Sequence, residues 1–247
     1  MEVAFYASDP VWDGRFVAAV RTTGVFCRPS CRVRKPLPKN VDYMADAATA
    51  QAAGYRACLR CQPESSTPVA LRQIGTPIGP MTIGATGRTV VLADFTERAM
   101  MPAQLAAVRR RIGPTAFGSS SLLDEVEREL AEYFAGAKTD FDLPLQMPGS
   151  GFQESVWSQL KRIPYGETIS YRELAWRVGV PAASRAVGRA NGANRLAVIV
   201  PCHRVVASGG GLGGYGGGLP AKRRLLDLEA AVASGDTNTN RGGAQSP

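Results

Sequence analysis

Four of the five cysteines stand in two close pairs along the chain. Three residues separate Cys27 from Cys31, and two separate Cys58 from Cys61. Each spacing allows two thiolates to reach one ion, and Zn²⁺ takes four such ligands tetrahedrally. The sequence therefore predicts one zinc ion held by these four cysteines. A zinc site that only stabilises the fold is the alternative to a reactive one.

The fifth cysteine, Cys202, is followed directly by His203, the only histidine in the chain. A free thiol is only a few per cent ionised at neutral pH, so a cysteine nucleophile needs a base or a positive neighbour. The pair therefore predicts a nucleophilic Cys202 with His203 as its base. The alternative is a small, buried and inert side chain at position 202.

The residues around the first cysteine pair carry a family resemblance. The segments are Arg21-Thr-Thr-Gly-Val-Phe-Cys-Arg-Pro-Ser-Cys31 and Ala53-Gly-Tyr-Arg-Ala-Cys-Leu-Arg-Cys-Gln-Pro63. They resemble the N-terminal module of the Ada-type DNA methyltransferases. The resemblance implies that Cys27 accepts a methyl group from a DNA methylphosphotriester, and that Thr23, Arg34 and Arg56 contact the DNA backbone. Four thiolates outweigh one Zn²⁺, so the anionic centre would repel a phosphodiester but admit a neutral triester.

The segment around Cys202 carries a second resemblance. Pro201-Cys-His-Arg-Val205 resembles the active-site motif of the O6-alkylguanine-DNA alkyltransferases, and the stretches 164–171, 184–191, 213–219 and 222–229 match that family in order and spacing. The resemblance implies that Cys202 is the methyl acceptor, that His203 is its water-linked base, and that Glu229 orients His203.

Three more residues receive roles from this resemblance alone. Asn194 would hold the active-site turn, Tyr171 would donate a proton to the substrate, and Arg185 would fill the stack vacated by a flipped guanine, which costs a few kcal/mol to extrude. The chain departs from the family at Arg195 and Ala197, where prolines are usual. This departure puts the rigidity of the segment in question.

Two stretches with linker composition, Pro63–Pro68 and Leu143–Gly151, divide the chain. The predicted fold is α+β and multidomain. Residues 1–64 form a small Zn(Cys)₄ α/β module, 65–147 a ribonuclease-H-like α/β subdomain, and 148–232 a mainly helical, winged helix-turn-helix-like alkyltransferase domain, the last two as the resemblance implies. The small polar residues 233–247 predict a disordered tail.

Periodicity, caps and turns predict the elements of the last two regions. A hairpin is expected from 81–85 and 89–95, followed by helices over 103–112 and 122–134 and another over 152–163. Ser170 to Glu173 is a capping-box pattern that opens a helix closed by Gly179, and Pro181 is expected to start the second helix of a helix-turn-helix. A last helix is expected from Pro220 to about Val232.

The net charge of +8 is unevenly distributed. Residues 1–64 carry +3, 65–147 carry −1 and 148–229 carry +6, which indicates two surfaces that meet a polyanion. No stretch approaches the ~18 apolar residues of a membrane span, and the N-terminus does not resemble a signal peptide. We therefore expect a monomer in the bacterial cytoplasm that binds alkylated double-stranded DNA, with no membrane partner.

The two resemblances together imply direct-reversal repair of alkylated DNA, with each cysteine site working once. No organic cofactor is expected. Gly211-x-Gly213-x-x-Gly216 matches the dinucleotide fingerprint, but it lies in a glycine-rich loop without a βαβ context, so nucleotide binding is rejected. The alternatives are a transcriptional regulator activated by methylation of Cys27 and a zinc-stabilised DNA-binding adaptor without chemistry.

Overall fold

A computed structural model describes residues 1–61, 63 and 68–235. The protein has a mixed α/β fold. Most of the predicted linker Pro63–Pro68, and the predicted disordered tail from residue 236 onward, lie outside the described residues. The chain forms two compact units. The first contains Met1–Leu71, Ala85–Gly87 and Pro102–Ser120, and the second contains Arg72–Gly84, Arg88–Met101 and the described residues from Ser121 onward.

A four-stranded sheet organises the N-terminal region. Its order is β3-β1-β2-β4, with β1 antiparallel to β2 and β3, and with β4 parallel to β2. Alternating residues of β1 face two small cores, one of which contains Phe5, Phe16 and the cysteines. Asp46 caps α2 by accepting from the Thr49 N–H at 2.7 Å. The elements are α1 (Glu2–Tyr6), β1 (Val17–Val20), β2 (Val25–Cys27), β3 (Val41–Met44), α2 (Ala47–Ala52) and β4 (Arg56–Ala57).

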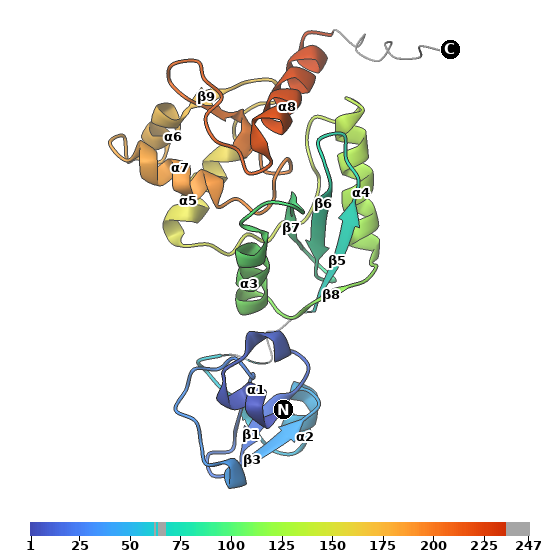
Figure 1. Ribbon diagram of the computed structural model, residues 1–247, viewed down its shortest axis with the longest axis vertical. Coiled ribbons are helices and arrows are strands. Elements are labelled where there is room, and N and C mark those ends of the chain that lie inside the picture. The colour runs from blue at the N-terminus through green and yellow to red at the C-terminus, as the bar shows by residue number, and fades with distance from the viewer. Residues whose placement is uncertain (62, 64–67, 236–247) are drawn as a thin grey trace. The chain divides into compact units, whose positions relative to one another are not determined.

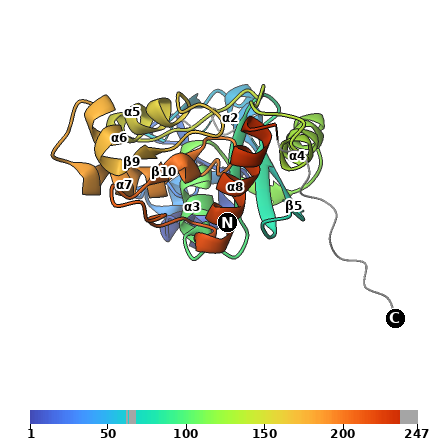
Figure 2. The same cartoon turned by 90° about the horizontal axis from the view of Figure 1, so that it is seen from above.

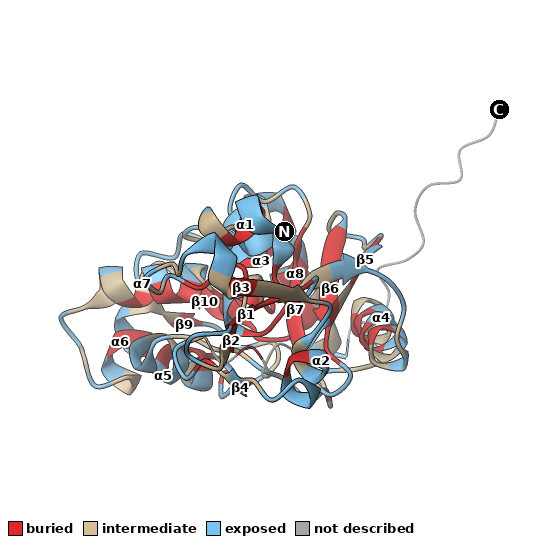
Figure 3. Cartoon of the chain, turned by 90° about the horizontal axis from the view of Figure 1, so that it is seen from below, coloured by how far each residue is buried: buried red, intermediate tan, exposed pale blue. Residues whose placement is uncertain are grey.

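A second sheet has the order β7-β6-β5-β8, with β5 parallel to β8. Strands β6 and β7 form the hairpin expected from the sequence, and both are buried along their whole length (Figure 3). Helix α4 lies along the sheet in Figures 1 and 2 and ends before Gly136, whose φ is +72°. The elements are β5 (Val69–Ile74), β6 (Met81–Ala85), β7 (Val90–Phe95), α3 (Met101–Arg111), β8 (Thr115–Phe117) and α4 (Ser121–Phe134).

The C-terminal part is mainly helical, and α5, α6 and α7 pack together (Figures 1 and 2). Ser150 forms a capping box with Gln153 at the start of α5, and Ser170 caps α6. A two-stranded parallel sheet joins β9 to β10, next to the Cys202 turn. The elements are α5 (Gly151–Leu160), β9 (Ile169–Ser170), α6 (Tyr171–Arg177), α7 (Ser184–Gly192), β10 (Val205–Val206) and α8 (Gly218–Ala233).

Three predicted helix boundaries in this part are wrong. The helix expected to begin at Pro181 begins at Ser184, because residues 181–183 form a turn that leads into it. Helix α5 ends at Leu160 instead of residue 163, and α8 begins at Gly218 instead of Pro220. In the described part of the chain, no helix combines the length and apolar character that crossing a membrane requires.

Candidate functional site

The four paired cysteines converge at one end of the N-terminal sheet. Cys27 is the last residue of β2, and Cys58 follows β4, which runs parallel to β2. Their ligand atoms, together with those of Cys31 and Cys61, all lie within 4.8 Å of one another. Tetrahedral zinc with bonds of ~2.3 Å to sulfur requires sulfurs this close, so the donor set fits one Zn²⁺.

Neighbouring side chains fix the loop between Cys27 and Cys31. The buried Asp13 carboxylate accepts from the Ser30 backbone N–H at 2.9 Å and from the Ser30 hydroxyl. Lys35 donates to the Cys31 carbonyl at 2.8 Å. Hydrogen bonds from Cys27 and Cys61 to the Cys31 sulfur lower the pKa of Cys31 below its usual value. These contacts therefore hold the loop that carries Cys27 and Cys31.

The three residues expected to contact DNA near this centre are all exposed. Thr23 lies in the turn between β1 and β2, and Arg34 follows Cys31 by three residues. Arg56 lies in β4 and is paired with Val25 of β2, the strand that ends at Cys27. All three side chains are accessible to a partner in solution.

Cys202 begins a buried 3-10 turn, Cys202–Arg204, and lines a cavity of ≈ 690 Å³ in the second unit. Burial raises the pKa of the Cys202 thiol, so its ionisation depends on a base. The cavity brings Cys202 together with two residues that the sequence analysis assigned, Tyr171 and Asn194. It is also lined by residues without an assigned role, among them Phe95, Arg98 and Tyr215.

Asn194 cross-links the turn that precedes Cys202. Its amide donates to the Val200 carbonyl at 2.8 Å and to the Leu196 carbonyl at 3.4 Å, and its side-chain oxygen accepts from the Leu196 N–H at 2.9 Å. Asn191, which the sequence analysis did not single out, donates to the Cys202 carbonyl at 3.3 Å. Two buried amides therefore hold the backbone on both sides of Pro201.

The segment that lacks the usual prolines is held by other contacts. The Ala93 N–H of β7 donates to the Arg195 carbonyl at 2.8 Å, and the Ala197 N–H donates to the Ala93 carbonyl at 2.6 Å. The Arg195 guanidinium is buried, lies 5.8 Å from the centre of the Trp157 ring, and donates to the Pro148 carbonyl at 3.2 Å. The two backbone hydrogen bonds to Ala93 and the buried Arg195 side chain therefore hold this segment.

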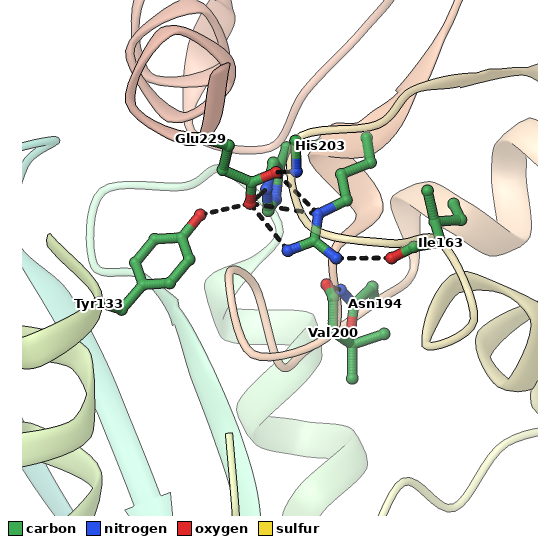
Figure 4. A network of polar contacts seen from close by, with 8 residues as sticks. Tyr133, Ile163, Asn194, Val200, His203 and Glu229 are labelled. Atoms are coloured by element: carbon green, nitrogen blue, oxygen red, sulfur yellow. Dashed lines mark hydrogen bonds and ion pairs between the residues drawn. The ribbon is translucent and has the colours of Figure 1, made fainter. Parts of the chain in front are cut away.

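His203 and Glu229 are completely buried and hydrogen-bonded to each other, with 2.8 Å between His203 Nε2 and Glu229 Oε1. The same carboxylate accepts from the Tyr133 hydroxyl at 2.6 Å and from the Gly166 N–H at 3.1 Å. Arg204 pairs with it through Nε, 2.8 Å from Oε2. Figure 4 shows Tyr133, from α4, reaching this cluster. The other ring nitrogen, Nδ1, makes no hydrogen bond with the described protein atoms.

The charges in this cluster are defined by its hydrogen bonds. Burial by itself raises the pKa of Glu229, but the hydrogen bonds from His203 and Arg204 outweigh burial and lower it to about 2. Burial lowers the pKa of His203, so the imidazole is neutral near pH 7. A neutral histidine fixed through Nε2 by an ionised carboxylate can accept a proton at Nδ1.

Tyr171 and Arg185 differ in their position relative to the cavity: Tyr171 lines it and Arg185 does not. Tyr171 starts α6, lies at the cavity wall and donates to the Gly214 carbonyl at 3.4 Å; burial raises its pKa, so the hydroxyl keeps its proton. Arg185 is exposed on α7 and is not among the residues that line the cavity, whereas Arg189 of the same helix is. The structure therefore brings Tyr171 to Cys202 but leaves Arg185 outside the cavity.

A buried ion pair in the cavity wall has no counterpart in the sequence analysis. Arg98 Nη1 lies 2.6 Å from Asp94 Oδ2 and donates to the Asn194 carbonyl at 3.2 Å, and Nη2 donates to the Gly192 carbonyl. Arg98 and Asp94 are separated from the cysteine motif by about a hundred residues of sequence, so no local pattern marked them.

Three family models match the chain in series. They are described as the metal-binding domain of Ada (residues 1–64), the ribonuclease-like domain of 6-O-methylguanine DNA methyltransferase (72–147) and the DNA-binding domain of 6-O-methylguanine DNA methyltransferase (151–231). Together they account for nearly all of the described residues.

Two curated relatives illustrate the similarity. The chain is 44% identical over 165 residues to a methylated-DNA–protein-cysteine methyltransferase of Mycobacterium tuberculosis, which covers 67% of this chain and 94% of the relative. It is 32% identical over 333 aligned positions to the bifunctional transcriptional activator/DNA repair enzyme Ada of Escherichia coli, covering 91% of this chain and 94% of that protein.

Solved structures agree with this similarity. The Mycobacterium tuberculosis protein OGT in complex with DNA matches with a TM-score of 0.57 and 41% identity, covering 67% of this chain and 94% of that one. The O6-methylguanine methyltransferase of the same organism gives the same TM-score at 42% identity.

Proposed function

Because this chain belongs to the methylated-DNA–protein-cysteine methyltransferases and carries an Ada-type metal-binding module, we propose that Cys202 and Cys27 each accept a methyl group from DNA. The protein is a DNA repair enzyme that reverses alkylation directly by moving the alkyl group to cysteine. A thioether is a stable product, so each cysteine works once. Cys202 takes methyl from O6-methylguanine, and Cys27 takes it from methylphosphotriesters.

At Cys202 the thiol proton passes through a linking water to Nδ1 of His203, and the sulfur attacks the methyl carbon. The new S–C bond forms as the bond from carbon to O6 breaks, and its electron pair stays on the purine. Tyr171 donates a proton to the purine, and the proton held by His203 restores Tyr171. The products are S-methylcysteine and neutral guanine. This proposal rests chiefly on one observation, the buried His203–Glu229 pair next to a cysteine that opens into a cavity.

In the N-terminal module, Cys27, Cys31, Cys58 and Cys61 would hold one Zn²⁺. Bound there, zinc would favour the deprotonated sulfurs, so Cys27 would be a nucleophile without a general base. Cys27 is only 3% exposed, so the methyl carbon of a triester must approach closely. Thr23, Arg34 and Arg56 would orient the DNA backbone, and Arg185 would enter the duplex beside the flipped guanine.

We also propose the domain boundaries 1–64, 65–147 and 148–232. A ribonuclease-H-like subdomain in the middle is supported by its hairpin beside a parallel strand pair, and a winged helix-turn-helix-like domain at the end is supported by the contact between α6 and α7. DNA is the partner. That the bound DNA is alkylated, that the protein is a monomer and that it works in the bacterial cytoplasm are parts of the same proposal.

Transcriptional regulation is the second candidate function, because the Escherichia coli relative is named as an activator as well as a repair enzyme. The alignment with that relative spans 333 positions, whereas this chain has 247 residues. The relative therefore contains a long stretch without a counterpart here. Repair needs only the two cysteine sites, which are present, and we favour repair as the primary function.

The proposal is tested by separating the two transfers. Cys202→Ala should eliminate transfer from O6-methylguanine and leave transfer from methylphosphotriesters, and Cys27→Ala should do the reverse. Cys27→Ala also removes a zinc ligand, so Cys61→Ala is its matched control. Each variant is mixed with duplexes carrying one lesion and analysed by peptide mass. Residual guanine repair in Cys202→Ala would refute the assignment of the acceptor.

A further inference from the structure

A tyrosine far from the active-site motif donates to the carboxylate that holds His203. The Tyr133 hydroxyl lies 2.6 Å from Glu229 Oε1, and both side chains are fully buried (Figure 4). Tyr133 belongs to α4, within the part of the chain that the ribonuclease-like family model matches. We propose that Tyr133 is a positioning residue of the proton relay and sets the basicity of His203 through Glu229. This inference rests on the proposed role of His203 as the base.

The argument begins with one shared oxygen atom. Glu229 Oε1 accepts from the Tyr133 hydroxyl, from His203 Nε2 at 2.8 Å and from Arg204 Nη2 at 2.9 Å. Oε2 accepts from the Gly166 N–H and from Arg204 Nε at 2.8 Å, and Arg204 Nε also lies 3.1 Å from Oε1. Donors that share one oxygen compete for its negative charge. The short bond from Tyr133 therefore weakens the hold of Glu229 on the His203 ring.

This competition bears on which form of His203 is favoured. An ionised carboxylate close to imidazole favours the protonated ring, and a base that already carries a proton cannot take one from Cys202. Burial raises the pKa of Tyr133 far above its usual value, so this hydroxyl keeps its proton and donates throughout the working pH range. Tyr133 thus favours the neutral ring that proton transfer needs.

Other charged or titratable groups near His203 also influence whether its ring is protonated or neutral. Arg204 and Lys222 disfavour the protonated ring, and Glu229 favours it. The remaining titratable groups around the cluster come from the neighbouring loops and the turn itself: Tyr165, Tyr215 and Cys202. Tyr133 differs from these groups because its uncharged hydroxyl donates to Glu229 Oε1, the oxygen that also bonds His203. Removing this hydroxyl therefore alters the relay while every formal charge stays in place.

Tyr165 provides a matched control. Its ring packs edge-on against Tyr133, with 5.9 Å between ring centres, and it lies 5.4 Å from the Arg204 guanidinium carbon. Its hydroxyl is buried but makes no hydrogen bond with the described protein atoms. Tyr165→Phe therefore removes a buried hydroxyl from the same cluster without touching Glu229.

The experiment uses the zinc-loaded full chain with ¹⁵N-labelled histidine. His203 is the only histidine, so one set of ring signals reports its pKa and tautomer directly. Tyr133→Phe should raise the titration midpoint by about one pH unit, and Tyr165→Phe should leave it at the wild-type value. Replacing Tyr133 with 3-fluorotyrosine keeps the ring and donates more strongly, so the midpoint should fall. Equal midpoints in all four proteins would overturn the inference, even if Tyr133→Phe were less stable.

Single-turnover transfer from O6-methylguanine separates this inference from the proposed function. In Tyr133→Phe the acidic limb of the pH–rate profile should move up by the same amount, which costs up to about tenfold in rate below the midpoint and little above it. A uniform loss at all pH values, shared with Tyr165→Phe, would show a packing role only. If His203→Asn keeps the wild-type rate and profile, the proposed relay itself fails, whatever Tyr133 does.

Discussion

Glu229 accepts hydrogen bonds from Tyr133, Gly166, His203 and Arg204, and its charge balances Arg204. With a pKa of about 2 in the folded protein, against ~4.3 for an unperturbed glutamate, the carboxylate is favoured by folding. A depressed pKa contributes stability above the unfolded value, and this contribution is lost as the pH falls toward 2. The residue thus serves stability and catalysis together.

Glu229→Gln should therefore be strongly destabilised at pH 7, by roughly 3–5 kcal/mol, because Arg204 loses the partner of a buried ion pair. The difference from wild type should shrink between pH 4.5 and 2, where wild type protonates the same group. Urea unfolding at several pH values measures it. A difference that stays constant down to pH 2 would contradict the assigned charge.

The turn between α7 and Cys202 is the element that places the nucleophile. Asn194 supplies three of its hydrogen bonds, and pairing with β7 holds its outer edge. Val198 has a φ of +72° within this turn, a conformation that a branched residue adopts only when its surroundings enforce it. The turn is therefore sensitive to the loss of a buried contact.

Asn194→Ala should cost about 2–3 kcal/mol and slow guanine repair, because it leaves the buried Leu196 N–H without its acceptor and removes one of the donors to the Val200 carbonyl. Asn194→Asp keeps the acceptor for the Leu196 N–H but not the donor, so it should also be impaired. Thermal unfolding and single-turnover rates on the same samples provide the measurement. Wild-type behaviour of both variants would mean that β7 alone holds the turn.

Helix starts and the hairpin were predictable from the sequence because the residues that form them lie close together in the chain. Ser150 and Ser170 cap helices through residues three positions away, and the strands 81–85 and 90–95 are joined by a four-residue link. The boundary at Pro181 was wrong because proline also fits the turn before a helix. Tyr133 and Arg98 were not predictable, since each meets its partner about a hundred residues away and only the folded chain brings them together.

At the scale of the whole molecule, the two sites belong to separate parts of the chain with different sources of stability. The cysteine cluster has a small core, and zinc binding would supply much of its folding energy. Chelation of the zinc should therefore unfold residues 1–61 and abolish phosphotriester repair, while guanine repair by Cys202 persists. Circular dichroism and lesion-specific transfer before and after chelation test this. Loss of both activities would argue that the regions fold as one.

Methylation of Cys27 removes one negative charge near the DNA surface. The methylated protein should bind unmodified duplex about tenfold more tightly at low salt, and the gain should shrink as salt rises. For a repair enzyme that samples any lesion, the gain should be the same on every sequence. Titration of unrelated duplexes measures it, and a marked preference for one duplex after methylation would favour the regulatory function.

The central claim is that one chain carries two independent methyl acceptors. The most direct measurement is the intact mass of the zinc-loaded protein after it reacts with duplex DNA that contains both lesions, followed by peptide mapping. We predict two additions of about 14 Da each, one on Cys27 and one on Cys202, and a single addition when either lesion is omitted. A single addition on doubly damaged DNA, or methyl groups on any other residue, would contradict the account.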